Sequence, residues 1–313
     1  MAESALTRRM IQKKNARKNL FDRMRRYRFI YVLLLPVLAY FLVFSYYPMA
    51  LGIVNSFREI RLLGGATFVG FKNYETIFAS PVYSQAFGNT LIVGIGTFLL
   101  QFAWGLVLAL CLNELRHKMT RSFFQTVTYI PNLLSWSVVG SIWITLLSPS
   151  GLINGLLEMI QGDSFRTVVF MSERSFARTI MIFTGAWKGA GYYAALFLAA
   201  VIAIDPTLYE AASIDGATRF QQIVSITVPA VVPTLKTVVI LGSMGVLRNF
   251  DQIFVMANSS IMDKVRNLLY LIYNEGIVQF KVGPASAAAC VVLLATMVIS
   301  FGVRRLIRYD KAD

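Results

Sequence analysis

Long runs of residues without a single charge constrain the fold of this chain more than any other feature. The first extends from residue 29 to residue 57, and a second from about residue 88 to residue 112. In a helix, about 20 apolar residues at 1.5 Å each cross the hydrocarbon core of a bilayer, which is about 30 Å thick. Each run is therefore long enough to span a membrane as a helix.

The composition supports a membrane protein throughout the chain. Hydrophobic residues make up 56% of the 313 residues, charged residues make up 15%, and the mean hydropathy is +0.60. A soluble chain of this length carries more charge, so the sequence predicts an all-α integral membrane protein. The formal net charge of +14 does not indicate a nucleic-acid partner, because the basic residues are concentrated in a tail and in short loops.

Six apolar segments have the length of a membrane span. We expect them at residues 30–50, 88–112, 123–147, 179–203, 229–249 and 284–304. Lys188 lies well inside the fourth. A lysine near the centre of a bilayer costs on the order of 3 kcal/mol, so its side chain should face the protein interior or water. This predicts a position on a translocation path or between subunits.

The distribution of basic residues predicts the orientation in the membrane. Residues 1–28 contain ten of them, and 19 of the 30 in the chain fall in segments assigned to one side, against nine in the three loops of the other. Because cytoplasmic segments carry an excess of Lys and Arg, both termini are expected in the cytoplasm. We expect a retained basic tail at 1–28, then a six-helix domain at 29–313 with its core at about 88–304.

A polar interruption at residues 205–229 separates the fourth span from the fifth. Asp205 can cap a helix whose first residue is a proline, a position where proline loses no intrahelical hydrogen bond. Gly216 can adopt the positive φ that ends this helix. A second short helix can begin at Thr218 and is expected to end where Pro229 closes the stretch. The predicted orientation places both short helices in the cytoplasm.

The same stretch contains a spaced motif, E-A-A-x3-G-x9-I-x-V-P, which resembles the EAA loop of permease subunits in binding-protein-dependent ABC importers. The matching residues are Glu210, Ala211, Ala212, Gly216, Ile226 and Pro229. Valine occupies position 228, where leucine is commoner. The resemblance implies a type I importer permease of six spans in a bacterial inner membrane, with a cytoplasmic coupling helix between the fourth and fifth spans.

The resemblance also implies partners. A second, homologous permease would pair with this chain, two ATPase subunits would each receive a coupling helix, and an extracytoplasmic binding protein would deliver the substrate. ATP and magnesium would be bound by the ATPases, since this sequence has no G-x-x-x-x-G-K-[ST] loop. The chain itself would then be a non-catalytic subunit without a cofactor.

Several segments resemble sugar-importer permeases in particular. They are FVGFKNYETIF at 68–78, NELR at 113–116, QT..YIPN..SW at 125–136, LLSPSGLIN at 146–154 and N-F-D-x-I-x-x-M at 249–256. This resemblance favours complex or acidic oligosaccharides, such as alginate or aldouronate, over maltose. The T-x-G-G-P that follows in many sugar permeases is replaced by Ala-Asn-Ser-Ser at 257–260, so glycerol phosphate or an amino acid stays open as the substrate.

Enzymatic and metal chemistry have little support in the residues. His117 is the only histidine, and the two cysteines, Cys111 and Cys290, lie within apolar segments. One histidine in a basic loop does not make a Ser/His/Asp set, and the cysteine spacing fits no metal site. An ion-coupled secondary transporter would need inverted repeats and intramembrane carboxylates. We see neither, and a membrane scaffold without transport stays open as a third class.

Polar and aromatic residues within or beside the spans mark a candidate translocation path. Aromatic faces stack on sugar rings, and amide or charged groups bond to hydroxyls. The candidates are Asn132, Trp136, Lys188, Tyr192, Asn249 and Asp251.

Overall fold

The computed structural model describes residues 26–61, 64–115 and 117–307. The chain divides into two units, Met1–Val54 and Asn55–Asp313, which are described separately below. Most of the predicted basic tail lies outside the described residues, as do Arg116, Arg308 and Lys311, which the predicted orientation also used.

The first unit contains the first predicted span. Helix α2 (Arg28–Phe41), a π-helical turn η1 (Leu42–Tyr46) and α3 (Tyr47–Ser56) form one continuous helix, which is longer at both ends than the predicted 30–50. In the described chain no residue of α2 or η1 is buried. A helix that is apolar and exposed on every side suits a lipid environment.

The second unit begins with a small β-hairpin that the all-α prediction did not include. Strand β1 (Arg58–Arg61) pairs antiparallel with β2 (Gly65–Phe68), and α4 (Lys72–Ala79) follows. The side-chain amide of Asn73, in α4, donates to the carbonyl oxygens of Ser56 and Arg58, both at 2.9 Å. The polar segment after the first span is therefore an ordered structure fastened to the start of this unit.

Long apolar helices make up most of the second unit. They are α5 (Pro81–Glu114), α6 (Lys118–Leu133), α7 (Trp136–Leu146), α9 (Ala177–Ile202), α11 (Arg219–Gln222) continued by η3 (Ile223–Thr227) and α12 (Val228–Ser243), and α16 (Val282–Leu306). With the helix of the first unit, four described helices are long and apolar enough to cross a membrane. Up to six are, if each bent helix pair counts as one span. The upper number equals the six spans predicted.

The predicted end of the second short helix at Pro229 is wrong. The chain is helical without interruption from Arg219 to Ser243, so the fifth span begins about ten residues earlier than the predicted 229–249 and ends before residue 249. Pro229 is one of the first two residues of α12, directly after the π-helical turn η3. Pro229 has no N–H to donate within this continuous helix, and the hydrogen-bond pattern changes from π to α just before it.

Shorter helices connect the spans. They are α8 (Leu152–Gln161), the 3-10 turn η2 (Gly162–Ser164), α10 (Pro206–Ile214), α13 (Asp251–Met256), α14 (Met262–Val265), α15 (Leu268–Tyr273) and the π turn η4 (Asn274–Val278). A buried asparagine, Asn89, holds the segment around α14 against α5 and α9. Asn89 in α5 donates to the carbonyl oxygens of Asp263 and Arg266, and accepts from Arg178 in α9 at 2.8 Å.

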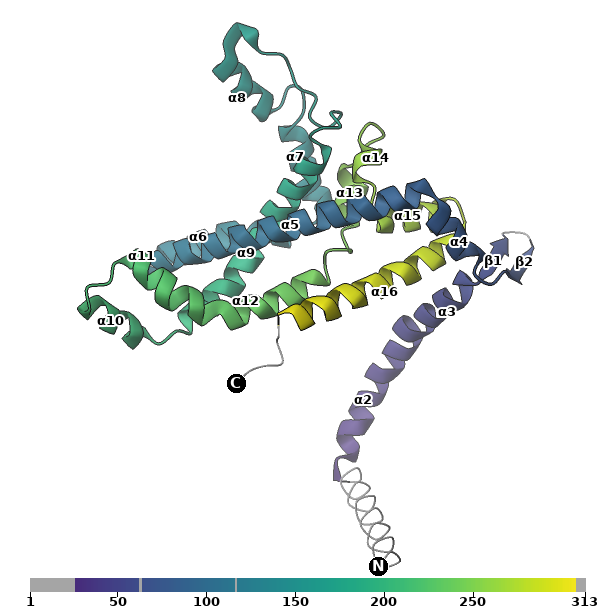
Figure 1. The fold of residues 1–313 in the computed structure, drawn as a ribbon, viewed down its shortest axis with the longest axis horizontal. Coiled ribbons are helices and arrows are strands. Elements are labelled where there is room, and N and C mark those ends of the chain that lie inside the picture. Colours follow the sequence, from purple (N-terminus) through teal and green to yellow (C-terminus); the bar gives the residue numbers. More distant parts are fainter. Residues whose placement is uncertain (1–25, 62–63, 116, 308–313) are drawn as a thin grey trace, which may run out of the picture. The chain divides into compact units, whose positions relative to one another are not determined.

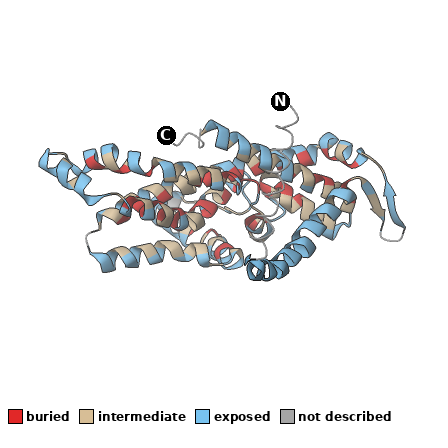
Figure 2. Ribbon diagram, turned by 90° about the horizontal axis from the view of Figure 1, so that it is seen from below, coloured by how far each residue is buried: buried red, intermediate tan, exposed pale blue. Residues whose placement is uncertain are grey.

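Helices α5 and α9 pack side by side along much of their length, with α6 on α9 (Figure 1). Helix α12 also contacts α9 and α16. Figure 2 shows that buried residues of the second unit gather along the facing sides of these helices, while their outer faces are exposed. At Gly105, a Cβ atom would overlap Tyr193 of α9, so the absence of a side chain lets the two helices approach closely.

Candidate translocation cavity and coupling loop

A cavity of about 370 Å³ lies between α5, the junction of α6 and α7, α9, and the end of α12 with the segment after it. Five of the six predicted path residues line it: Asn132, Trp136, Lys188, Tyr192 and Asn249. These come from three stretches that are distant in sequence. The fold therefore brings amide, aromatic and ammonium groups to one place.

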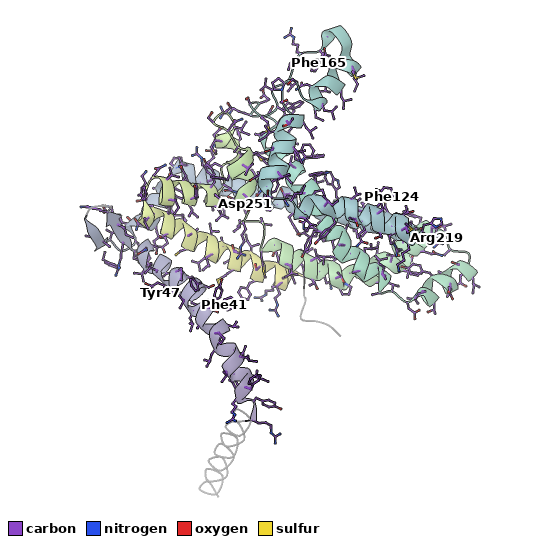
Figure 3. The ribbon with its side chains drawn as sticks, turned by 180° about the vertical axis from the view of Figure 1, so that it is seen from behind. Phe41, Tyr47, Phe124, Phe165, Arg219 and Asp251 are labelled. Atoms are coloured by element: carbon purple, nitrogen blue, oxygen red, sulfur yellow. The ribbon has the colours of Figure 1, made fainter. Side chains whose placement is uncertain are left out.

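Asp251 does not line this cavity. It is the first residue of α13 and is exposed, whereas the next residue, Gln252, is fully buried and forms part of the cavity wall. Successive residues of an α-helix point about 100° apart, since a turn contains 3.6 residues. At the start of α13, Gln252 therefore points into the protein and Asp251, which Figure 3 labels, points elsewhere.

Several polar residues of the wall were missed by sequence reasoning. They are Thr97 and Gln101 in α5, Tyr193 in α9 and Gln252 in α13. Gln101 Nε2 donates to the Tyr193 hydroxyl at 3.2 Å, which joins α5 to α9 at the cavity. A signal was present, because Gln101 is an amide in the middle of an uncharged run, and such a group avoids lipid.

Buried amides hold the segment after α12 in place. Gln252 Nε2 donates to the carbonyl oxygen of Met181 at 2.7 Å and to Thr184 Oγ1 at 2.8 Å, both in α9. Asn249 Nδ2 donates to Gln252 Oε1 at 2.7 Å, and the backbone oxygen of Asn249 accepts from the side-chain amide of Asn267. Because a buried polar group without a partner is costly, this network fixes the non-helical backbone beside the cavity.

Helices α6 and α7 meet at a bend of 100°. Leu134 and Ser135 have extended backbone angles at the bend, and the Ser135 hydroxyl caps α7 by accepting from the Val138 N–H at 3.4 Å. The carbonyl groups at the end of α6 consequently lack α-helical partners beyond the bend. Trp136 begins α7, so the bend itself faces the cavity.

Lys188 satisfies two of these carbonyl groups. Its Nζ donates to the backbone oxygens of Pro131 at 3.2 Å and Asn132 at 2.9 Å, and it lies 5.7 Å from the centre of the Trp136 ring. A cation is favourable at the negative end of a helix dipole. The expectation that Lys188 faces the protein interior is confirmed, since it lines the cavity and is half-buried.

Two glycines allow the helices around the cavity to approach closely. A Cβ atom at Gly94 in α5 would overlap the carbonyl oxygen of Val246, and one at Gly191 in α9 would overlap that of Thr128 in α6. A larger residue at either position would push backbone segments apart. The cavity walls are therefore held at short backbone separations.

The predicted ends of the helix that follows α9 are confirmed. Asp205 accepts from the Thr207 N–H at 3.0 Å, and Pro206 is the first residue of α10. This hydrogen bond holds the pKa of the Asp205 carboxyl below its ordinary value. Gly216 has φ +78°, and the Ala217 N–H donates to the Ala212 oxygen at 2.9 Å, which is the hydrogen bond of a Schellman cap.

Side chains fasten α10 to the start of the fifth span. Gln222 in α11 is buried, and its Nε2 donates to Ser213 Oγ in α10 at 2.9 Å. Thr218 and Gln221 form a reciprocal capping box at the start of α11. Residues 205–222 are therefore a compact unit joined to the helix that continues to Ser243.

The outward side of this loop is apolar at several positions. Leu208, Ile214 and Phe220 are 51%, 86% and 75% exposed. Of the motif residues, Glu210, Ala211, Gly216 and Pro229 are exposed and Ala212 and Ile226 are half-buried. Figure 3 labels Arg219 at the start of α11, beside this loop and distant from Asp251. Exposed apolar side chains on a well-capped helix suit contact with another protein.

No group of three or more His, Cys, Asp or Glu side chains within the described residues is arranged to hold a metal ion.

Residues 101–308 match the protein family described as binding-protein-dependent transport system inner membrane component. This chain belongs to that family. The permease is 33% identical to the polygalacturonan/rhamnogalacturonan transport system permease protein YteP of Bacillus subtilis (strain 168), over 86% of this chain and 84% of YteP. It is 29% identical to the diacetylchitobiose uptake system permease protein NgcF of Streptomyces coelicolor, over 93% of this chain and 85% of NgcF.

A solved structure extends the match to three dimensions. The crystal structure of a bacterial ABC transporter involved in the import of the acidic polysaccharide alginate contains a chain that matches the permease with a TM-score of 0.85 and 31% sequence identity. The match covers 94% of this permease and 100% of that chain. The predicted importer-permease fold and the resemblance to sugar permeases are thereby confirmed.

Proposed function

We propose that this permease is one of two homologous membrane subunits of an importer that moves an oligosaccharide across the inner membrane, using ATP hydrolysed by separate subunits. The observation that carries the proposal is the cavity, where the Trp136 and Tyr192 rings accompany the side chains of Asn132 and Asn249. Sugar rings stack on aromatic faces and their hydroxyls bond to amides. Its volume of about 370 Å³ falls within the range of small-molecule sites, roughly 300–1,000 Å³.

The relatives support a saccharide as the substrate. Permeases named for polygalacturonan or rhamnogalacturonan and for diacetylchitobiose match over most of this chain, and so does a chain of an alginate importer. These names include both acidic and uncharged saccharides. They support the oligosaccharide class without deciding its charge.

The capped loop at 205–222 is the proposed contact with the ATPases. Both termini and this loop lie in the cytoplasm in this proposal, as the excess of basic residues predicts. ATP and magnesium bind in the ATPase subunits, and a solute-loaded extracytoplasmic binding protein docks on the other side. When ATP closes the ATPase dimer, the two coupling helices move together and rock the spans from inward-open to outward-open. Hydrolysis resets them.

Purification of the tagged permease from membranes of its own organism tests this proposal. A second permease and an ATP-hydrolysing chain are expected to co-purify. After reconstitution in liposomes, the oligosaccharide-loaded binding protein should stimulate ATP hydrolysis, and labelled oligosaccharide should accumulate only when ATP is present. Purification without an ATP-hydrolysing partner, or accumulation driven by an ion gradient without ATP, would contradict the proposal.

A further inference from the structure

The translocation cavity carries a single formal charge. Among the described residues that line it, Lys188 is charged, and no Asp, Glu, Arg or His takes part. The ion pairs of the described chain join Arg61 and Lys72 to Glu59, and Arg174 to Asp263. None of them involves Lys188.

The hydrogen bonds of Lys188 leave its charge uncompensated. Its partners are the backbone oxygens of Pro131 and Asn132, at 3.2 and 2.9 Å. These are neutral dipoles, which orient the ammonium group without neutralising it. A lysine has three N–H donors, and these two bonds leave one for another acceptor. Removing an ammonium group from water without a counter-ion is costly, so a carboxylate that entered the cavity would gain a strong partner.

The ammonium group of Lys188 lies over the ring of Trp136. The distance from Lys188 Nζ to the ring centre is 5.7 Å, and both side chains line the cavity. Because the ammonium group covers part of one face of the indole, a pyranose ring in the cavity would pack against the part that is left, with its substituents close to the ammonium group. In a hexuronic acid, one of these substituents is the C6 carboxylate. The spacing between Trp136 and Lys188 is therefore suited to one sugar unit that offers both an apolar face and a negative charge.

We infer that Trp136 and Lys188 form a subsite for an acidic sugar unit, in which the indole stacks on the ring and the ammonium group binds the carboxylate. This inference rests on the proposed function, and it names the substrate class as uronate-containing oligosaccharides. The fixed backbone at the end of α6 holds the ammonium group in place before the substrate arrives. Asn132 and Asn249, in the same cavity, are available for hydroxyls.

The test compares one negatively charged substrate with two uncharged ones. The complete transporter, with its partner permease, ATPases and binding protein, is reconstituted in liposomes, and uptake is measured for trigalacturonate, its uncharged methyl ester and diacetylchitobiose. The variant Lys188→Gln keeps donors for the α6 carbonyls but loses the charge, and Lys188→Arg keeps the charge. Lys236→Met is the matched control, because Lys236 is an exposed lysine of α12 that does not line the cavity.

Each uptake rate is expressed relative to the unaltered transporter for the same substrate, so the preference of the binding protein cancels. Lys188→Gln should lower trigalacturonate uptake by about tenfold or more, the size expected when a hydrogen bond between charged groups is lost. Uptake of the uncharged saccharides should fall clearly less than uptake of trigalacturonate, because they lose no contact between charged groups. Lys188→Arg and Lys236→Met should keep uptake of trigalacturonate.

Three results would overturn the inference while leaving the proposed function intact. They are an equal loss for charged and uncharged substrates in Lys188→Gln, no loss for either, and an unaltered transporter that carries only uncharged saccharides. Failure of the unaltered transporter to carry any saccharide would instead refute the proposed function, and the inference with it.

A measurement on the unaltered complex covers the case in which Lys188→Gln fails to assemble. In the absence of the binding protein, each substrate is titrated into the complex and the quenching of tryptophan fluorescence is measured. The concentration of trigalacturonate at half-saturation should be about tenfold lower than that of its methyl ester. Equal concentrations would overturn the inference.

Discussion

The hydroxyl of Tyr209 in α10 lies 2.8 Å from the hydroxyl of Thr227 in η3, and this hydrogen bond joins the two across 18 residues of sequence. We expect Tyr209→Phe to loosen the contact between α10 and the fifth span. One hydrogen bond contributes about 1 kcal/mol, so the transporter should assemble normally but move less substrate per ATP hydrolysed. Uptake and ATPase rates in liposomes measure this ratio. Tyr31→Phe, an exposed tyrosine of α2, is the control, and an unchanged ratio in Tyr209→Phe would contradict the prediction.

Replacement of Gly216 should disconnect ATP hydrolysis from transport. Its φ of +78° is closed to proline and costs another L-residue about 1–2 kcal/mol. Gly216→Pro should keep the membrane fold but lose most of the binding-protein-stimulated ATPase activity and uptake. Gly216→Asn is the matched variant, since asparagine tolerates a positive φ, and it should retain most activity. Normal ATPase activity and uptake in Gly216→Pro would count against the coupling role of this loop.

Glu210 is exposed on α10, so its replacement should affect a partner rather than the permease itself. We expect Glu210→Gln to change the free energy of unfolding of the purified permease by about 0.5 kcal/mol or less, as for most surface changes. Its binding-protein-stimulated ATPase activity should fall severalfold. Glu158→Gln, at an exposed glutamate of α8, is the control and should change neither quantity. If both variants behave alike, Glu210 has no special part in coupling.

The close approach of α5 to the segment after α12 should make Gly94 intolerant of a methyl group. A Cβ there would overlap the carbonyl oxygen of Val246, whereas one at Gly88, in the same helix, meets nothing within 4 Å. Gly94→Ala should destabilise the permease by about 1–3 kcal/mol, as overpacking does elsewhere. Gly88→Ala should be neutral or stabilising, because alanine is the better helix former. Thermal unfolding in detergent compares the two, and equal stabilities would show that the backbones are not in contact.

The cap of α10 should weaken in acid. Its hydrogen bond lowers the pKa of Asp205, so the carboxylate stabilises the helix start above the ordinary carboxyl pKa of about 4, and this contribution is lost as the pH falls through the lowered value. Asp205→Asn keeps a cap that does not titrate. Hydrogen exchange of the α10 amides should show greater protection in the unaltered permease than in Asp205→Asn at neutral pH. The difference should disappear in acid, and a constant difference would refute a role for the charge.

Much of the fold could be predicted because a bilayer demands a specific length of apolar helix. The cap at Asp205 and the positive φ of Gly216 depend on local chemistry, and the structure confirms them. The six predicted spans equal the upper limit of the four to six helices in the described chain that are long and apolar enough to cross a membrane. The end of the second short helix could not be predicted, because the π turn before Pro229 has no local signature. The position of the bend in the third span also depends on tertiary contacts. Pro131 lies inside α6, and the chain bends only after Leu133.

The cavity could be predicted where polar groups stand out against apolar spans. Lys188, Asn132 and Trp136 are unusual residues at membrane depth, and the structure places all three in one wall. The prediction that Asp251 lines the cavity was wrong, because the direction of its side chain depends on the residue at which α13 begins. No side-chain cap marks that start. Gln252 was overlooked for the same reason, since one step along a helix exchanges inward for outward.

The uninterrupted helix from Arg219 to Ser243 has a mechanical consequence. Its N-terminal end contacts α10 through Gln222, and residues near its other end, including Gly242, line the cavity. At 1.5 Å per residue, these two points lie about 30 Å apart on a single rod. A tilt of the loop would therefore also move the wall of the cavity. The π turn at 223–227 is where this helix would bend first.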